Sequence, residues 1–137
     1  MKILICGLPG SGKTWLAERL VRNLDNCAWF NADIVRKTEN DWDFSPEGRI
    51  RQSLRMKNLA DFEKRHGRLV ICDFVCPTKE TQKNFDPDIT VWMNTIKSGR
   101  YEDTNKMFEE PSEVDFRIKE KNNENHKVIA EEILKRV

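Results

Sequence analysis

The 137-residue sequence has few features of membrane, disulfide-rich or polybasic proteins. No apolar stretch reaches the roughly 20 residues of a membrane span, so we expect no membrane association. Its four cysteines show no C-x-x-C spacing, and Cys6 and Cys72 lie in apolar runs, where cysteine acts as a small hydrophobic residue. We therefore expect reduced thiols, with neither zinc nor disulfide. The 24 basic and 23 acidic residues leave a net charge of +1, which argues against bulk electrostatic capture of nucleic acid.

The length favours one compact core, since 16.2 kDa is too little for two ordinary domains. We expect a single domain over residues 1–137. The first residues run directly into an apolar strand pattern and leave no room for a removable signal peptide. A cytoplasmic location is therefore expected.

The most informative segment is Gly7-Leu-Pro-Gly-Ser-Gly-Lys-Thr14, which fits the phosphate-binding pattern G-x-x-x-x-G-K-[ST]. It follows an apolar run and precedes a helical pattern from Trp15 onward, as such a loop requires. The glycines let backbone N–H groups face the phosphates, the lysine reaches the β/γ oxygens, and the threonine hydroxyl suits Mg²⁺. The segment predicts binding of ATP with Mg²⁺. The expected nucleotide-binding set is Gly7, Pro9, Gly10, Ser11, Gly12, Lys13 and Thr14.

Apolar runs typical of strands recur at 3–6, 27–30, 69–74 and 89–93, with a weaker run at 114–118. Helical spacing lies between them. This alternation predicts an α/β fold of the P-loop NTPase type, three layers around a central, mostly parallel five-stranded sheet. Ligands of such a sheet lie at the carboxyl ends of its strands.

A long helix is expected to begin near Ser45, a capping residue followed by proline at the first helical position. Its core-facing stripe is predicted to contain Ile50, Leu54, Leu59 and Phe62. A last amphipathic helix is expected over 125–137. The polar stretch 94–111 is the least regular part of the chain, and we expect it to form a lid over a nucleotide.

Chemically active side chains follow the predicted strands. Asn31, Asp33 and Arg36 come after the second strand, and Asp73 closes the third. Phe44, Arg49 and Gln52 lie around the start of the long helix, and Trp42 precedes them. Trp15, Trp29 and Trp92 are expected in the core.

These segments together resemble adenylylsulfate kinase, which phosphorylates the 3′-hydroxyl of adenosine 5′-phosphosulfate with MgATP. Residues 7–14 are close to the family's G-L-S-G-[AS]-G-K-[ST], residues 31–36 to its D-G-D-x-[VI]-R, and residues 44–52 to its F-S-x-x-x-R-x-x-N. Residues 74–77 match its F-[IV]-S-P. Residues 101–111 are similar in spacing to its Y-E-x-P stretch. The resemblance runs in register from about residue 1 to residue 118.

The resemblance implies an ATP-dependent kinase of sulfate assimilation with adenosine 5′-phosphosulfate as acceptor. Lys13 and Asp33 would be catalytic, with Asp33 orienting the acceptor hydroxyl or accepting its proton. Arg36 and Arg49 would hold the phosphosulfate, since guanidinium groups suit clustered anionic oxygens. Phe44 and Tyr101 would enclose the adenine. The implied acceptor site is completed by Gln52, Val75 and Cys76, and relatives of this kind commonly form homodimers.

Departures from the family pattern concern the metal and the lid. Asn31 stands where the family has an acid, and Asp73 has the position of a Walker B acid that could replace it, so Thr14 and Asp73 are the expected metal residues. Asp73 could instead cap a nearby helix or turn. The lid has only Ile-Lys-Ser-Gly-Arg between Thr95 and Tyr101, where the family carries a lysine-rich helix. Candidates for the missing cation are Lys97, Arg100 and Lys106, each of which could equally be a solvated surface charge.

Two other functions fit the same residues. A kinase of this fold could act on another acceptor, either a polynucleotide 5′-hydroxyl or a small molecule, because an aspartate followed by an arginine serves those reactions too. The absence of a basic stripe with interleaved aromatic residues argues against nucleic acid. A nucleotide-binding module without turnover is the second alternative, suggested by the short lid and by Asn31.

Overall fold

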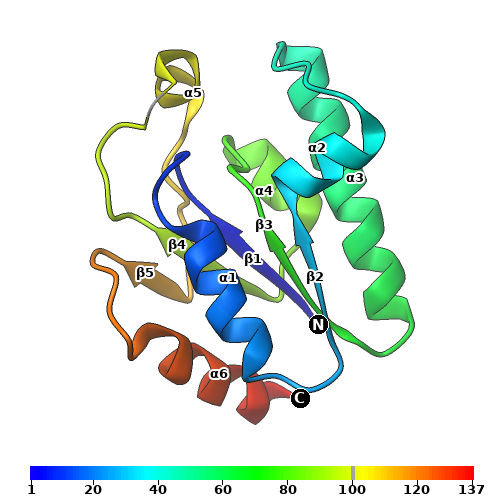
Figure 1. Cartoon of the computed structure of the whole chain (residues 1–137), viewed down its shortest axis with the longest axis vertical. Helices are drawn as coiled ribbons and strands as arrows, with labels where there is room; N and C mark the ends of the chain where they lie inside the picture. The colour runs from blue at the N-terminus through cyan, green and yellow to red at the C-terminus, as the bar shows by residue number, and fades with distance from the viewer. Residues whose placement is uncertain (100) are drawn as a thin grey trace.

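The computed structural model describes residues 1–99 and 101–137 as an alternation of strands and helices (Figure 1). The elements are β1 (Lys2–Cys6), α1 (Lys13–Arg22), β2 (Cys27–Asn31), α2 (Ala32–Glu39), α3 (Pro46–Arg65), β3 (Leu69–Asp73), α4 (Lys79–Phe85), β4 (Ile89–Met93), α5 (Glu102–Met107), β5 (Phe116–Ile118) and α6 (Asn125–Arg136). Within the described residues no helix is long and apolar enough to cross a membrane.

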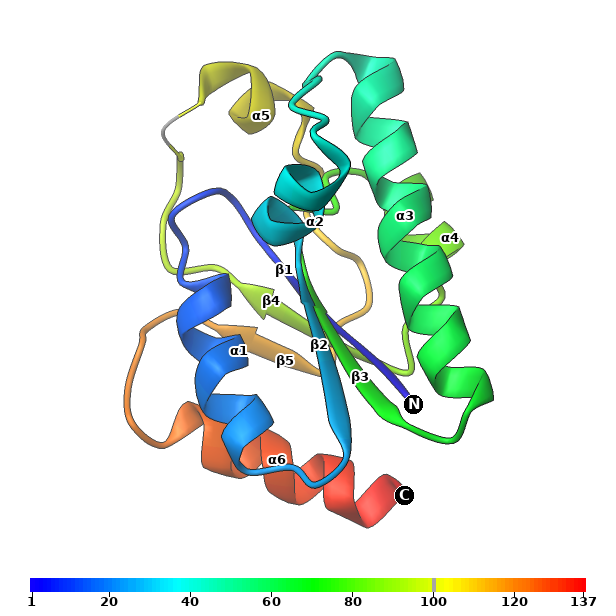
Figure 2. The same ribbon diagram turned by 45° about the vertical axis from the view of Figure 1, so that its right-hand side comes forward.

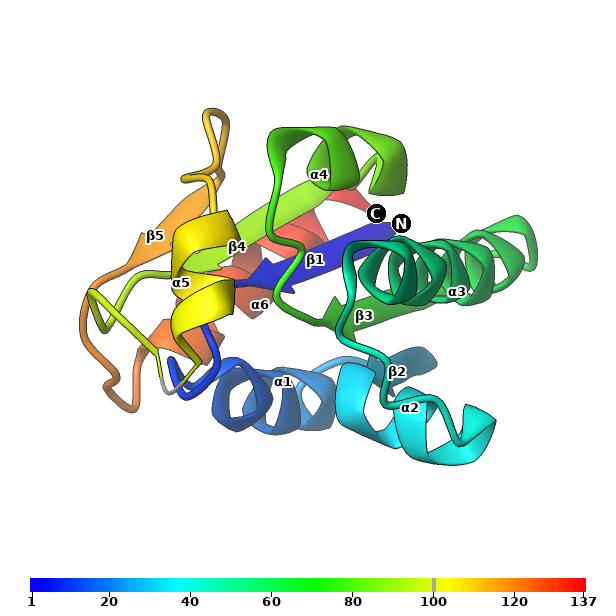
Figure 3. The ribbon, with the colours of Figure 1, turned by 90° about the horizontal axis from the view of Figure 1, so that it is seen from above.

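The five strands form one sheet in the order β2-β3-β1-β4-β5, and all four described pairings are parallel. This confirms the predicted α/β fold with its five-stranded sheet. Because the strands are parallel, their carboxyl ends meet at one edge of the sheet. Figure 3 views the molecule from that end of the sheet. In Figure 1, α5 lies at the same end, and both chain termini lie at the opposite end.

Helices cover both faces of the sheet, which gives the three expected layers. Alternate residues of β1 enter opposite cores: Ile3 and Ile5 pack with the buried residues of α1 and α6, whereas Leu4 and Cys6 pack with those of α3. This alternation follows from the two-residue period of a strand. Near-continuous apolar strands are typical of a parallel sheet that is covered on both faces.

The predicted core-facing stripe of α3 is wrong for three of its four residues, while Leu59 packs against the core as predicted. The side chains of Ile50, Leu54 and Phe62 are about half exposed, and the buried positions of this helix are Gly48, Gln52, Met56 and Ala60. The four-residue spacing of this set defines the buried face, and its small and flexible members let α3 approach the sheet closely. Figure 2 shows α3 extending along the side of β2 and β3.

Three short helices were not anticipated from apolar periodicity: α2, α4 and α5. The first two begin at side-chain caps. Asn31 accepts a hydrogen bond from Ile34 N at 3.1 Å, and Thr78 forms a reciprocal capping box with Thr81. A cap of this kind stabilises a helix by about 1 kcal/mol, which matters most in helices too short to bury a full apolar stripe.

Candidate functional site

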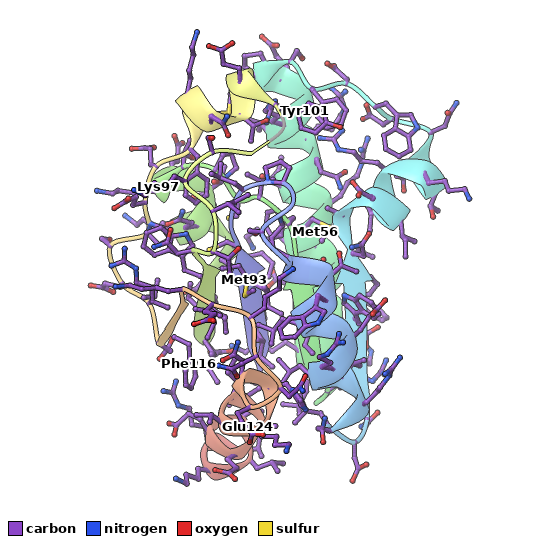
Figure 4. All side chains as sticks on the ribbon, turned by 60° about the vertical axis from the view of Figure 1, so that its left-hand side comes forward. Met56, Met93, Lys97, Tyr101, Phe116 and Glu124 are labelled. Atoms are coloured by element: carbon purple, nitrogen blue, oxygen red, sulfur yellow. The ribbon has the colours of Figure 1, made fainter. Side chains whose placement is uncertain are left out.

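A cavity of about 960 Å³ opens at the carboxyl ends of the strands. All of the predicted site residues line it except Gly7 and Ser11, which are buried behind the loop wall. The phosphate-binding loop forms one wall, and α2, the start of α3 and the segment after β3 form the other. Tyr101, on the segment that precedes α5, also lines the cavity (Figure 4).

The loop between β1 and α1 has a backbone that only glycine tolerates. Gly7 has a φ of 148°, and a Cβ there would lie 2.6 Å from the carbonyl oxygen of Met93. Gly12, with a φ of 102°, leads into α1 at Lys13. Gly12, Lys13 and Thr14 at this helix start line the cavity, where backbone N–H groups and the helix dipole favour an anion. Lys13 Nζ donates to the carbonyl of Leu8 at 2.9 Å, so its ammonium group is held beside the loop.

Thr14, Asn31 and Asp73 form a hydrogen-bonded cluster next to the loop. The Thr14 hydroxyl donates to Asp73 Oδ2 at 3.0 Å, and Asn31 Nδ2 lies 2.9 Å from the same carboxylate oxygen and 3.0 Å from Thr14 Oγ1. Asp73 Oδ1 accepts a hydrogen bond from the indole nitrogen of Trp29 at 2.7 Å. Asp73 therefore caps neither a helix nor a turn in this arrangement; Asn31 caps α2 instead.

The environment of Asp73 acts on its charge in two directions. Burial raises the pKa of this carboxyl above its usual value, because desolvation disfavours the charged form, while the donors Trp29, Thr14 and Asn31 favour the carboxylate and limit the rise. A bound cation would add to the second effect.

The donor set fits Mg²⁺ held jointly by protein and phosphates. In the described part of the chain no three His, Cys, Asp or Glu side chains gather into a metal cage. Mg²⁺ in nucleotide sites takes one or two protein oxygens and completes its shell with phosphate oxygens and water. A hydroxyl and a carboxylate beside a phosphate-binding loop match that requirement.

The opposite wall carries two arginines against Phe44. The Arg36 guanidinium lies 4.3 Å from the centre of the Phe44 ring and donates to the carbonyls of Asp41 and Asp43. Burial lowers the pKa of Arg36, although the guanidinium stays charged at neutral pH. Arg49 Nε donates to the Phe44 carbonyl at 2.8 Å. Both cations are thus fixed by backbone contacts around the loop that presents the Phe44 ring.

The remaining predicted acceptor residues differ in exposure. Asp33 is exposed at the start of α2, and Phe44 and Tyr101 are 52% and 58% exposed, so these three present open surface to the cavity. Gln52 is buried and donates to the carbonyl of Ala32, which ties α3 to α2. Cys76 is buried at a φ of 47°, and burial raises the pKa of its thiol.

Described residues of the stretch 94–111 contact the phosphate-binding loop and α3. Thr95 Oγ1 donates to the Ser11 carbonyl at 2.7 Å, and Asn105 bridges both backbone groups of Gly99. Arg49 Nη2 donates to Thr104 Oγ1 at 3.1 Å and thereby joins α3 to α5.

The positions of the candidate lid cations do not favour a role for them at the cavity. Lys97 is exposed on the segment between β4 and α5 (Figure 4), and Lys106 pairs with Glu102 on the outer surface of α5. Neither lines the cavity. Arg100 lies outside the described residues.

Sequence reasoning missed several residues at the site. Trp15 and Trp29 are not fully in the core: Trp15 lines the cavity, and Trp29 bonds to Asp73. Trp42 lines the cavity, as its place before Phe44 suggests. Thr104 of α5 also lines it, and the pattern of the lid sequence gave no signal for that residue.

The comparisons with known proteins agree with this geometry. A family model described as an AAA domain matches residues 3–128. The probable adenylyl-sulfate kinase of Aeropyrum pernix is 35% identical over 85 residues. That match covers 58% of this chain and 46% of the relative, so it spans about half the relative's length.

Solved structures share the whole architecture. The crystal structure of APE1195 aligns with a TM-score of 0.85 at 23% identity, covering 100% of this chain and 96% of that chain. The Mycobacterium tuberculosis APS kinase CysC in complex with AMPPNP and APS has a TM-score of 0.75 at 19% identity, covering 98% and 95%. A sugar kinase from Janibacter reaches 0.70 at 15% identity, covering 98% and 92%. These structures support the fold, and with the family and sequence matches they confirm the resemblance predicted from the motifs.

Proposed function

We propose that this chain, which belongs to the AAA domain family, is an ATP-dependent phosphotransferase that acts on adenosine 5′-phosphosulfate. The acceptor's 3′-hydroxyl oxygen attacks the γ-phosphorus of ATP, the bond to the β,γ-bridging oxygen breaks, and ADP leaves together with 3′-phosphoadenosine 5′-phosphosulfate. The observation that carries the proposal is the cavity itself, which has a phosphate-binding loop on one wall and fixed arginines with an open aromatic ring on the other.

The loop wall suits the donor. Backbone N–H groups around Gly10 and Gly12 bind the phosphates of ATP, and Lys13 moves from the Leu8 carbonyl to the β/γ oxygens as charge develops there. Thr14 and Asp73 would hold Mg²⁺, which neutralises charge on the β- and γ-phosphates when bound.

The opposite wall suits an anionic, base-bearing acceptor. Arg36 and Arg49 face the cavity as fixed cations, which fits a phosphosulfate group. The exposed rings of Phe44 and Tyr101 offer two apolar surfaces for the adenine. Asp33, exposed in the same cavity, orients the acceptor hydroxyl or takes its proton, a role in which positioning matters more than basicity.

A second candidate is phosphoryl transfer to a different acceptor, either a small molecule such as a sugar or a polynucleotide 5′-hydroxyl. The observation that favours it is the Janibacter sugar kinase, which shares the fold at a TM-score of 0.70. Asp33 would keep its role at the acceptor hydroxyl, whereas Arg36 and Arg49 would contact another group of the acceptor. A nucleotide-binding module without turnover is the remaining outcome.

The first experiment measures ADP release with MgATP and adenosine 5′-phosphosulfate, and identifies the product by mass. Lys13→Ala serves as the blank. Asp33→Asn should keep ATP affinity and lower kcat by about 100-fold or more, whereas Asp25→Asn, on an exposed turn between α1 and β2, should leave both unchanged.

Each result assigns the chain to one function. Product from sugars or 5′-hydroxyl oligonucleotides alone would favour the second candidate. ATP binding without product from any acceptor would refute phosphotransfer, and a fully active Asp33→Asn enzyme would remove the role given to Asp33.

A further inference from the structure

We propose that Trp29 is a positioning residue that fixes the carboxylate of Asp73 for the metal of the bound nucleotide. The inference rests on the proposed function only in requiring a metal–ATP donor, and it does not depend on the acceptor. Trp29 lies outside the cavity lining and would act through Asp73 alone.

The sheet register places the two side chains on one face. Trp29 pairs with Ile71, and Asn31 pairs with Asp73. Because side chains alternate along strands, Trp29 and Asn31 on β2 share a face with Ile71 and Asp73 on β3. That face packs against α1, which carries Thr14. The indole thus reaches diagonally from β2 to Asp73 on the neighbouring strand β3, a separation that long aromatic side chains can span.

The two carboxylate oxygens of Asp73 have different partners. Oδ1 accepts from Trp29 Nε1 at 2.7 Å, while Oδ2 accepts from Thr14 Oγ1 and Asn31 Nδ2. The indole bond therefore sets the rotation of the carboxylate about its last torsion and keeps Oδ2 turned toward Thr14. Without it, Oδ1 would lose a close partner in a largely buried position.

The chemistry of the indole suits this role. An indole N–H donates and has no lone pair to offer a cation, so it orients the carboxylate without competing for the metal. Asn31 is itself fixed, since its Oδ1 accepts from Ile34 N at the start of α2 and its Nδ2 points to Asp73. The Thr14 proton is directed to Asp73, which leaves a hydroxyl lone pair for Mg²⁺.

The test measures metal binding directly. Mn²⁺ is titrated into the protein with a non-hydrolysable ATP analogue, and bound Mn²⁺ is measured by electron paramagnetic resonance. Trp29→Phe keeps an aromatic ring but removes the N–H, and we expect Mn²⁺ affinity to fall by about tenfold or more, the usual effect of losing a partner behind a metal ligand. Binding of the analogue without metal should be unchanged. Trp92→Phe, in β4 beside Phe108 and Arg117, is the matched control and should leave Mn²⁺ affinity unchanged.

A double-mutant cycle separates positioning from packing. If Trp29 acts through Asp73, Trp29→Phe should have no further effect on Mn²⁺ affinity in an Asp73→Asn background. Additive losses, or a Trp29→Phe affinity within twofold of the parent, would overturn the inference. A parent protein that fails to bind Mn²⁺ with the analogue would instead refute the metal–ATP role in the proposed function.

A second measurement covers the case in which Trp29→Phe does not fold. In the ¹⁵N-tryptophan-labelled parent, the Trp29 indole N–H should exchange slowly with water and shift when Mg²⁺ is added to the protein–analogue complex. The resonance is identified by its response to Asp73→Asn, which leaves the Trp29 ring in place. Rapid exchange and no response to Mg²⁺ would contradict the proposal.

Discussion

A buried lysine in the central strand allows a sharp test of the packing behind the site. The side chain of Lys2 is 3% exposed, and its ammonium nitrogen lies 2.7 Å from Asp61 Oδ1 on α3. The Phe85 carbonyl also accepts from it, and the Phe85 ring centre is 4.9 Å away. Asp61 has a second cation, Lys57, at 2.6 Å, whereas no other described carboxylate pairs with Lys2.

Because Asp61 has a second cation and Lys2 has no second described carboxylate, removing either partner should change the free energy of unfolding by a different amount. Removing one partner of a buried ion pair costs about 3–5 kcal/mol, because the other charge stays buried without compensation. Asp61 is 24% exposed and the Phe85 carbonyl remains, so Asp61→Ala should lower the free energy of unfolding by about 2–3 kcal/mol, or Tm by roughly 6–12 °C. Lys2→Met removes the buried charge and leaves Asp61 with Lys57, so its effect should lie between neutral and about 1 kcal/mol stabilising.

Urea denaturation at pH 7, followed by circular dichroism, measures the free energy of unfolding of the parent, the two single variants and the double variant. The double variant Lys2→Met/Asp61→Ala should recover most of the stability lost in Asp61→Ala, since the only charge that then loses its partner is the more exposed Lys57. Lys57→Met, which removes the more exposed cation, should change stability by less than about 1 kcal/mol. If Lys2→Met is as destabilising as Asp61→Ala, or if the double variant is less stable than either, an uncompensated Lys2 charge is not the cause of the loss.

Two further predictions concern the lid and the thiols. Thr104→Val removes the hydroxyl that accepts the Arg49 hydrogen bond and joins α3 to α5. Steady-state kinetics should then show a several-fold higher KM for the acceptor substrate, equivalent to about 1 kcal/mol, and an unchanged KM for ATP. Equal effects on both KM values would contradict a lid function for this contact. Burial raises the pKa of Cys27 to about 11 and of Cys6 to about 12, so thiolate is scarce at pH 7 and becomes commoner as pH rises. The native protein should therefore react slowly with a thiol reagent at pH 7 and faster toward pH 10. Denaturant should expose all four thiols to the reagent. A rapid reaction of the native protein at pH 7 would contradict the burial of these thiols.

Strands were predictable from the sequence because a parallel sheet covered on both faces needs near-continuous apolar runs, as in 69–73 and 89–93. The face of α3 was not predictable in the same way. Its larger apolar residues, Ile50 and Leu54, line a second cavity between α3 and α4, while the small Ala60 and the flexible Met56 lie against the sheet. Apolar spacing shows that a helix is amphipathic, but close packing on a sheet can select small residues over large ones.

Part of the site was also accessible from the sequence. The phosphate-binding loop is a local structure, so its spacing alone predicts the backbone of Gly7 and Gly12. The contacts of Trp29 with Asp73 and of Arg49 with Thr104 join residues 44 and 55 positions apart. They depend on sheet register and on where α5 lies, and no local pattern encodes either.

Asn31, which stands where the resembled family has an acid, and Asp73 act as a pair at the ends of β2 and β3. The register pairs these residues directly, and their side chains are in contact at 2.9 Å. Two carboxylates at that distance would repel each other and raise the pKa of at least one. With an amide at the end of β2, the neighbour donates a hydrogen bond to Asp73 instead, which helps the buried carboxylate to stay ionised despite the cost of its burial. The amide also caps α2, whose first turn carries Asp33. A single side chain thereby links the proposed metal residue to the proposed acceptor residue, so substitutions at Asn31 should not be interpreted as effects on the metal alone.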